Sequence, residues 1–322
     1  MIAKGISLRG LELFEIIART GSVAKTAERA GLSLPAVSQQ LKTLEDSIGR
    51  PLLDHSRRPM SLTPAGQVFL RRTQEALAQI RQAQAEATVL ELSHLTELGL
   101  GVIDDFESEI TPALATTLAG TLTNCRFRMR TKPSHVLVQM LQDGEIDVAI
   151  AATPDSGADG LKVRPLIDDP FVLALPAGIP LDPAALSDTV TGLPMLRYSQ
   201  DQLIGRQIER ALQMMQFEIP NRFELDSVQS LHALVAAGAG WAVTTPLSFL
   251  RAKRFRDDID LHPVPMPPFA RTISVFSKGD WIDDVARDLA EALRQMLRDR
   301  IVTPMLDREP WLEGSLVLHD PD

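Results

Sequence analysis

The sequence is poor in cysteine and has no long uninterrupted apolar segment. Cys125 is its single cysteine, so no disulfide can form within the chain, and we expect this thiol to be buried as a small apolar group. No stretch approaches the ~20 apolar residues that span a bilayer, and residues 1–14 hold no apolar run of signal-peptide length. These absences predict a cytoplasmic protein without a membrane segment.

The signatures of several enzyme classes are also missing. There is no Gly-x-x-x-x-Gly-Lys-Ser/Thr loop, no Gly-x-Ser-x-Gly turn and no His-Glu-x-x-His motif. Gly99-Leu100-Gly101 lacks the third glycine of a dinucleotide loop, and six scattered histidines with one cysteine form no metal-ligand cluster. The sequence therefore predicts no catalytic residue, no metal site and no cofactor.

The length and the charge distribution indicate more than one domain. A chain of 322 residues exceeds the size of one compact core and predicts two or three domains. The net charge of −9 is unevenly divided: residues 1–66 hold nine Lys and Arg against six Asp and Glu (+3), and residues 93–322 hold 21 against 33 (−12). This division is expected if only the N-terminal part contacts a polyanion.

Residues 21–41 form two short helical patterns that meet at a glycine-containing turn, which predicts a helix-turn-helix. The second helix has Ser33 as its expected N-cap and Pro35 in its first turn. Its apolar stripe consists of Val37, Leu41, Leu44 and Ile48. The outward side chains, Ser33, Ser38, Gln39 and Lys42, are of a size and polarity that can reach base edges in a major groove. The alternative is an ordinary two-helix corner with capping serines.

Residues 51–63 contain two short extended runs around a basic tip. This pattern predicts a β-hairpin wing in which Arg57 and Arg58 meet phosphates. A solvated charged turn is the alternative.

Together these residues closely resemble the winged helix-turn-helix domain of LysR-type transcriptional regulators. The pattern consists of Gly21-Ser22, Ala27, Leu32-Ser33, Pro35-Ala36-Val37-Ser38, Leu41, Leu44-Glu45, Gly49, Leu52, Arg58, Leu62-Thr63 and Ala65-Gly66. So many positions in register over about 50 residues are far more specific than a lone short motif. With the resemblance, the expected DNA-binding residues are Ser22, Ser33, Pro35, Ala36, Ser38, Gln39, Lys42, Arg57 and Arg58.

Three positions depart from the family pattern. Leu53 stands where the family usually has Phe, which should only repack the base of the wing. His55 replaces a usual Arg, so the phosphate contacts of the wing are expected to rest on Arg57 and Arg58. Thr26 stands where Ala is usual.

From residue 64 to about residue 92 the pattern is that of one long helix. Its apolar seam is spaced at alternating intervals of four and three residues: Phe69, Thr73, Ala76, Ile80, Ala83, Ala87 and Leu90. The seam could pack on its own chain or pair with a second copy. We favour pairing, because in a dimer the two recognition helices are separated by about one turn of the DNA duplex, or by a multiple of it.

The remainder reads as strands that alternate with helices, which predicts parallel α/β sheets. The first run comprises strands at 98–103, 126–131 and 147–151 with helices at 111–119 and 134–142. The second comprises strands at 171–175, 194–198, 222–226 and 241–245 with helices at 202–215 and 227–237, followed by a strand at 271–277 and a helix at 281–301. The most economical arrangement is two lobes: lobe I at about 93–162 and 269–301, and lobe II at about 163–268. Two chain crossings then form a hinge and a ligand cleft.

Ligands bind open α/β sheets beyond the carboxyl ends of the strands. That rule selects candidate effector-binding residues in both lobes: Asp104, Asp105, Phe106, Ser134, His135, Thr153, Ser199, Gln200, Ser227, Thr244 and Thr245, with Ala152 beside Thr153. For each residue, a plain cap or turn role is the alternative.

Asp104 and Asp105 bear on the chemistry of the effector. Many effectors of the resembled family are small carboxylates, which this acidic pair would repel. The acids could point away, pair with Arg130 or Lys132, or bind an effector that carries an amine. The amine, or a zwitterion, is slightly favoured.

The expected architecture is multidomain, α and α/β. It consists of a winged helix-turn-helix at 1–66, a linker and dimerisation helix at 67–92, and a two-lobed effector domain of periplasmic-binding-protein type at 93–322. The resemblance implies a homodimeric or homotetrameric regulator that binds an imperfect inverted repeat in double-stranded DNA, with a small-molecule effector as ligand and RNA polymerase as a candidate partner. There are two alternatives. One is a helix-turn-helix regulator whose α/β domain only mediates oligomerisation and binds no effector, and the other is a solute-binding α/β protein. The sequence leaves open the effector, the target genes, the sign of regulation and the role of residues 302–322.

Overall fold

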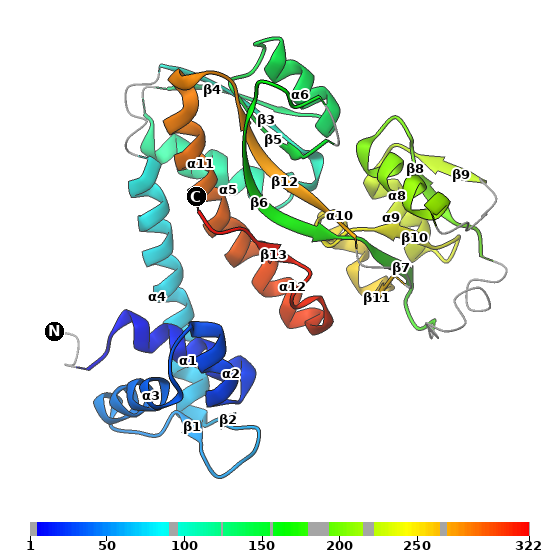
Figure 1. Ribbon diagram of the computed structural model, residues 1–322. Coiled ribbons are helices and arrows are strands. Elements are labelled where there is room, and N and C mark those ends of the chain that lie inside the picture. The colour runs from blue at the N-terminus through cyan, green and yellow to red at the C-terminus, as the bar shows by residue number, and fades with distance from the viewer. Residues whose placement is uncertain are drawn as a thin grey trace. The chain divides into compact units, whose positions relative to one another are not determined.

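The computed structural model describes residues 5–89, 96–123, 125–154, 157–179, 193–214, 222–264 and 269–321. The chain divides into two compact units, Met1–Gln84 and Ala85–Asp322 (Figure 1). No helix within these described ranges combines the length and apolarity needed to cross a membrane.

Unit 1 begins with three capped helices: α1 (Leu8–Thr20), α2 (Val23–Ala30) and α3 (Leu34–Ile48). Each begins after a serine whose hydroxyl accepts a backbone N–H, and each ends at a glycine in the left-handed conformation. These signals define the helix ends locally, because they satisfy backbone groups that the helix itself leaves unpaired. The predicted helix-turn-helix is therefore present.

The apolar stripe of α3 forms the core of unit 1. Val37, Leu41 and Leu44 are at most 3% exposed, and they pack with Leu13 and Phe14 of α1. Burying each such side chain contributes about 1.5–3 kcal/mol. The opposite face of α3 is left to solvent.

The predicted wing follows α3 as an antiparallel pair, β1 (Leu53–Asp54) and β2 (Ser61–Leu62). The long helix α4 (Pro64–Val89) begins directly against it. A Cβ on Gly66 would lie 2.0 Å from the Leu52 carbonyl oxygen, so only glycine fits this approach.

The first residue of the predicted apolar seam of α4 contacts α1 of the same chain. The rings of Phe69 and Phe14 lie 5.7 Å apart, so Phe69 contacts its own chain. The pairing of the seam with a second copy stays a prediction. Ala76 is exposed. The side chains of Ala83 and Ala87, and all of Leu90, lie outside the described residues.

Lobe I of unit 2 is built on a mixed sheet. Its order is β13-β6-β12-β5-β3-β4, comprising β3 (Glu97–Val102), β4 (Arg126–Thr131), β5 (Val148–Ala152), β6 (Lys162–Pro170), β12 (Ala270–Ser277) and β13 (Val317–Leu318). The strands β4, β3 and β5 are parallel, as predicted, whereas β12, β6 and β13 join antiparallel. Right-handed crossovers in opposite directions place α5 (Ile110–Thr121) and α6 (Ser134–Gln142) on opposite faces. Helix α11 (Asp283–Leu297) packs with α5.

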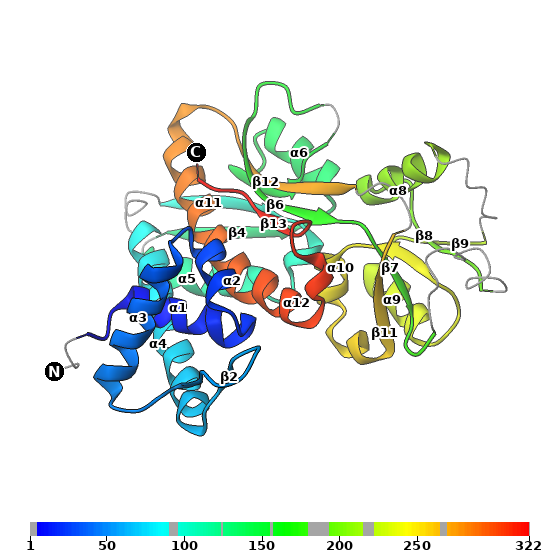
Figure 2. The same cartoon turned by 60° about the horizontal axis from the view of Figure 1, so that its bottom comes forward.

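The predicted lobe boundary is wrong, and the C-terminal segment, whose role the sequence left open, joins lobe I. The chain does not leave lobe I near residue 162, because β6 pairs with β12 and the crossing follows Pro170. The C-terminal segment also belongs to lobe I: α12 (Thr303–Arg308) leads to β13, which pairs with the edge of β6 (Figure 2). Leu312 and Leu316 bury their side chains there.

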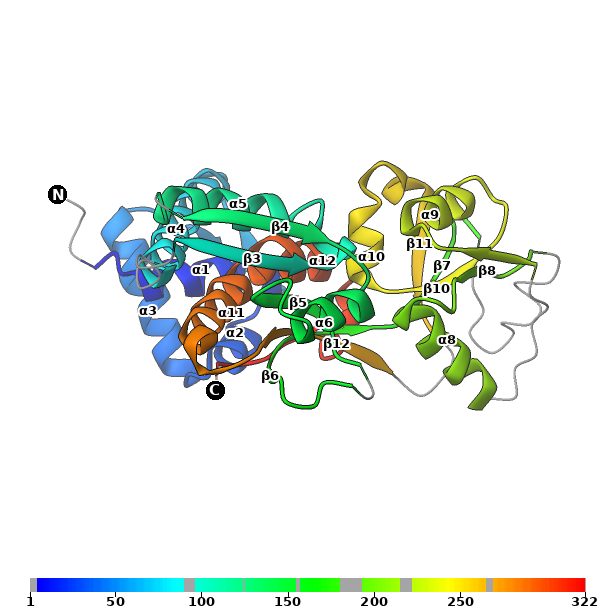
Figure 3. The same ribbon diagram turned by 90° about the horizontal axis from the view of Figure 1, so that it is seen from above.

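Lobe II contains two small sheets. The strand β7 (Val172–Pro176) lies between β10 (Ala242–Thr244) and β11 (Ile259–Pro263), both antiparallel to it, and β8 (Leu196–Tyr198) pairs in parallel with β9 (Phe223–Leu225). The helices are α8 (Leu203–Met214), α9 (Val228–Ala236) and α10 (Pro246–Arg251). Lobe II lies beside lobe I, and β6 and β12 run toward it (Figure 3).

Short helical turns complete the two lobes: η2 (Asp104–Phe106), η4 (Lys253–Asp258), η5 (Asp280–Ile282), η6 (Arg298–Val302) and η7 (Pro310–Leu312).

Candidate functional site

The exposed face of α3 carries the polar side chains predicted to read DNA. Ser33 accepts a hydrogen bond from the Ala36 amide at 3.4 Å, which fixes the start of the helix. Ser38, Gln39 and Lys42 are exposed. Pro35 is also exposed, whereas Ala36 is half-buried.

Ser22 caps α2 rather than α3. Its hydroxyl accepts from the Lys25 amide at 3.4 Å, and its carbonyl accepts from the buried Thr26 hydroxyl at 2.8 Å. Thr26 thus finds a partner for its hydroxyl where the family usually has Ala.

The tip of the wing is basic and exposed. Arg57 Nε lies 3.1 Å from Asp54 Oδ2, and the Arg57 side chain is 71% exposed. Hydrogen bonds from Ser56 lower the pKa of Asp54, so this carboxylate stays charged beside Arg57. Arg58 donates to the carbonyls of His55 and Arg57 at 3.4 and 3.2 Å. Both guanidinium groups are accessible to an anion.

Glu45 is a residue whose role the sequence did not reveal. Its Oε1 accepts from the backbone amides of Leu52 and Leu53 at 2.7 and 3.0 Å, and its Oε2 lies 3.0 Å from His55 Nε2. One carboxylate therefore ties the recognition helix to the first strand of the wing. His55, in place of the usual Arg, is part of this tie.

A cleft of about 440 Å³, including space open to solvent, lies between the lobes of unit 2. Its polar lining consists of Asp104, Asp105, Ser134, Gln202, Ser248 and Arg271. Its apolar lining consists of Ile103, Pro133, Ala152, Leu203, Ile204 and Val228. Residues of both lobes contribute to this lining.

Four of the residues that the strand-end rule selected line this cleft: Asp104, Asp105, Ser134 and Ala152. Phe106 was expected beside them, but it is fully buried in the core, because η2 turns its ring inward. His135 is exposed beside Ser134 and is not a lining residue. Partial burial, and then Arg206, lower the pKa of His135.

The other predicted residues support the surrounding structure instead of lining the cleft. The Thr153 hydroxyl lies 2.9 Å from that of Ser274. Ser199 accepts from the Asp201 amide, the Gln200 amide donates to Glu224, and Ser227 caps α9. Thr244 and Thr245 are fully buried.

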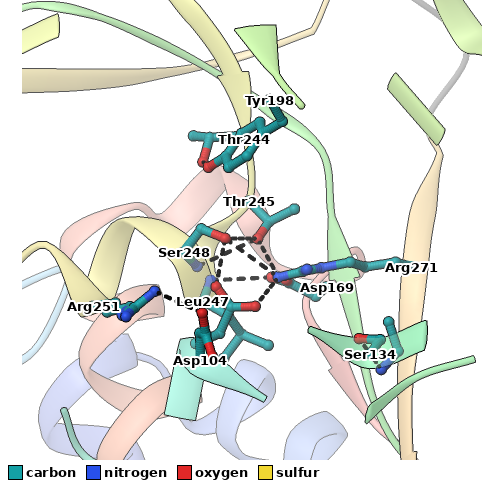
Figure 4. A network of polar contacts seen from close by, with 12 residues as sticks. Asp104, Ser134, Asp169, Tyr198, Thr244, Thr245, Leu247, Ser248, Arg251 and Arg271 are labelled. Carbon is teal, nitrogen blue, oxygen red and sulfur yellow. Dashed lines mark hydrogen bonds and ion pairs between the residues drawn. The ribbon is translucent and has the colours of Figure 1, made fainter. Parts of the chain in front are cut away.

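Arg271 is the centre of a buried polar network that the sequence did not predict (Figure 4). Its Nη2 donates to Asp105 Oδ2 at 2.9 Å, Asp169 Oδ2 at 2.8 Å and Thr245 Oγ1 at 2.9 Å. Ser248 donates to Asp105 at 2.7 Å. Because Thr245 and Ser248 belong to lobe II, this network joins the lobes.

The network also shows which cations pair with the acidic residues. Asp105 pairs with Arg271, and Asp104 lies 3.6 Å from Arg251 Nη1. The predicted partners Arg130 and Lys132 form neither ion pair. The acids are nonetheless in excess, since Arg271 faces two carboxylates, Asp105 and Asp169.

Burial changes the acidity of these groups. It raises the pKa of Asp169 to about 6, against the opposing effect of Arg271. It also raises the pKa of Asp104, and Arg251 opposes that rise. Although burial lowers the pKa of Arg271, Asp105 and Asp169 raise it above its ordinary value, so the guanidinium remains charged.

Comparison with known families identifies both units. The family description "Bacterial regulatory helix-turn-helix protein, lysR family" matches residues 8–67, and "LysR substrate binding domain" matches residues 94–298. The chain belongs to the LysR family. It is a LysR-type transcriptional regulator with an N-terminal DNA-binding domain and an effector-binding domain, so the predicted family, fold class and function are confirmed. The alternative of a solute-binding protein with an incidental N-terminal corner is wrong.

Relatives of this LysR-type regulator align along nearly its whole length. A hydrogen peroxide-inducible genes activator of Pectobacterium carotovorum subsp. carotovorum is 24% identical over 92% of this chain and 99% of its own. A probable nitrogen assimilation transcriptional activator of Synechococcus elongatus is 26% identical over 90% and 94%. An OxyR mutant from Corynebacterium glutamicum shares the fold at 22% identity and a TM-score of 0.55, covering 95% of this chain and 96% of that one.

Proposed function

We propose that this LysR-type regulator binds an imperfect inverted repeat in double-stranded DNA as a homo-oligomer, under the control of a small molecule in the interlobe cleft. The observation that carries the proposal is the presence of two sites in one chain. One is the exposed polar face of α3 beside a basic wing, and the other is a cleft lined from both lobes. As a regulator of transcription it acts in the cytoplasm, where it meets DNA, and RNA polymerase is its candidate partner.

The DNA-binding residues divide into two roles. Gln39 and Lys42, with Ser33 and Ser38, are suited to base edges and adjacent phosphates, because an α-helix fits the major groove. Arg57 and Arg58 are suited to phosphates, which bind without regard to sequence. Ser22, Pro35 and Ala36 hold or border the two helix starts.

The effector contacts follow the lining of the cleft. Asp104, Asp105 and Ser134 are joined by Gln202, Ser248 and Arg271. A ligand that contacts both lobes favours one relative position of the lobes. In an oligomer, that change alters how the two winged domains are spaced, and hence the bend that they impose on DNA.

The experiment that tests this function is a footprint of the purified protein on the DNA upstream of its own gene and its divergent neighbour, at two salt concentrations. Protection of an imperfect inverted repeat at both salt concentrations supports the proposal. Weak binding that is equal on all DNA and is lost with added salt contradicts it, because such binding is purely electrostatic.

A further inference from the structure

The cleft offers an acceptor for a positively charged group. Asp104 lines it with a side chain that is 37% exposed, and its ion pair with Arg251 has a separation of 3.6 Å. Arg251 forms a closer pair with Glu107, at 2.7 Å. Asp104 thus keeps much of its capacity to accept hydrogen bonds from a ligand.

The cleft also offers donors for a negatively charged group. Arg271 is only 5% exposed, and its Nε and Nη2 are bound within the network, but its Nη1 has no hydrogen-bond partner among the described residues. Nη1 is not a fully buried atom, so its two N–H donors are open to water or to a ligand. Because Arg271 lines the cleft, Nη1 is the atom that remains to bind a ligand.

Ser134 adds a second donor to the same wall. Its Oγ accepts from the Ala152 amide at 3.0 Å, so its hydroxyl proton is left to donate to a ligand. Ser134 is the first residue of α6, a helix of nine residues whose N-terminus favours negative charge.

The balance of charge determines which ligands these groups accept. Four carboxylates, of Asp104, Asp105, Glu107 and Asp169, stand against three cations, Arg251, Arg271 and Lys132. A ligand with only carboxylates would add to this excess of negative charge. A ligand with only an amine would leave Arg271 Nη1 and Ser134 without an acceptor.

We infer that the effector is a zwitterion with an apolar side chain, of the α-amino acid class. Its ammonium group binds Asp104, and its carboxylate binds Arg271 Nη1 and Ser134 at the start of α6. Its side chain packs on Ile103, Leu203, Ile204 and Val228. This inference rests on the proposed function only in taking the cleft as the effector site.

The first experiment measures thermal shifts of the full-length protein with each of the twenty L-amino acids. The best apolar amino acid is then compared by calorimetry with its amine and acid analogues; for L-leucine these are 3-methylbutylamine and 4-methylpentanoate. We expect each analogue to bind at least tenfold more weakly than the amino acid. The inference is overturned if no amino acid raises the melting temperature, or if the acid analogue binds as tightly.

Two variants test the assignment of the ammonium contact. Asp104→Asn should reduce the affinity for the amino acid at least tenfold, with little effect on the acid analogue. Glu107→Gln is the matched control, because it removes a carboxylate from the same Arg251 without altering the cleft lining. Equal losses in both variants would contradict the assignment. Ser134→Ala provides an independent readout. It should weaken the binding of the amino acid and leave the binding of the amine analogue unchanged.

The outcomes separate this inference from the proposed function. DNA protection without binding of any amino acid contradicts the zwitterion and leaves the regulator intact. Binding of an amino acid without DNA protection supports the zwitterion and contradicts the proposed DNA site.

Discussion

Ser248 Oγ of lobe II lies 2.7 Å from Asp105 Oδ1 of lobe I, and Ser248 is fully buried. The Asp105 side chain is only 8% exposed, so this bond joins the lobes away from bulk water. It does not act alone, because Asp169 accepts from the Leu247 amide at 3.2 Å. Helix α10 is thereby held to lobe I next to the cleft.

Ser248→Ala should therefore destabilise unit 2. Removing a buried hydrogen bond to a charged acceptor costs roughly 1.5–3 kcal/mol. The measurement is urea unfolding of the full-length protein. Ser230→Ala, on the exposed side of α9, is the control and should change the free energy of unfolding by less than about 0.5 kcal/mol. Equal effects of the two substitutions would show that the bond contributes nothing to stability.

The raised pKa of Asp169 predicts a specific pH dependence. Burial raises this pKa from 3.8 to about 6. Between these values the folded state holds a proton that the unfolded state releases, so the contribution of Asp169 to stability falls as the pH rises from about 4 to 6 and is constant above that window. The difference in unfolding free energy between the wild type and Asp169→Asn should shift by about 3 kcal/mol across the window, in favour of the wild type at the acid end. A difference that is flat from pH 4.5 to 7.5, or one of opposite sign, would contradict the assignment.

Glu45 should control the order of the wing more than the stability of the helices. Glu45→Ala removes the acceptor for the amides of Leu52 and Leu53. We expect faster hydrogen exchange at these two amides and weaker DNA binding. Asp46→Ala removes an exposed neighbouring carboxylate and is the matched control. Unchanged exchange at Leu52 and Leu53 would show that the wing holds its position without Glu45.

Substitutions in the wing and in the recognition helix should affect DNA binding in different ways. Arg58→Ala should weaken binding to all sequences and reduce the salt slope by about 1, because one phosphate contact is lost. Gln39→Ala should change the preference between sequences. Arg298→Ala, at the exposed first residue of η6, should change neither. Equal losses on specific and random DNA from both Arg58→Ala and Gln39→Ala would refute this division of roles.

Local signals predicted individual elements well. The bounds of β4 and α6 agree with those predicted. Both predictions rested on neighbouring residues, because apolar and basic side chains alternate over Arg126–Thr131 and the helical pattern ends before Gly144. The lobe boundary could not be found in this way. In β6, Arg164 pairs with Asp283 and Asp168 accepts from Thr272, and both partners are more than 100 residues away.

Part of the cleft lining could be predicted from the sequence. The rule about the carboxyl ends of parallel strands selected Asp104 and Ser134. It could not select Arg271, because this residue lies at the start of β12, an antiparallel strand. An antiparallel strand brings its first residues to the edge where its parallel neighbours end, and this is the signal that would have found Arg271.

The pairing of α4 with a second copy is open to a direct test at Ala76. Phe69 packs on Phe14 of its own chain, so a pairing surface has to lie further along the helix, where Ala76 is exposed. Ala76→Glu would bring two like charges together in a dimer and should shift the full-length protein toward monomer in analytical ultracentrifugation at micromolar concentration. Gln74→Glu adds the same charge at an exposed position off the seam and should leave the assembly unchanged. If Ala76→Glu sediments like the wild type, α4 does not pair through this seam, and the spacing of the winged domains has to be set elsewhere.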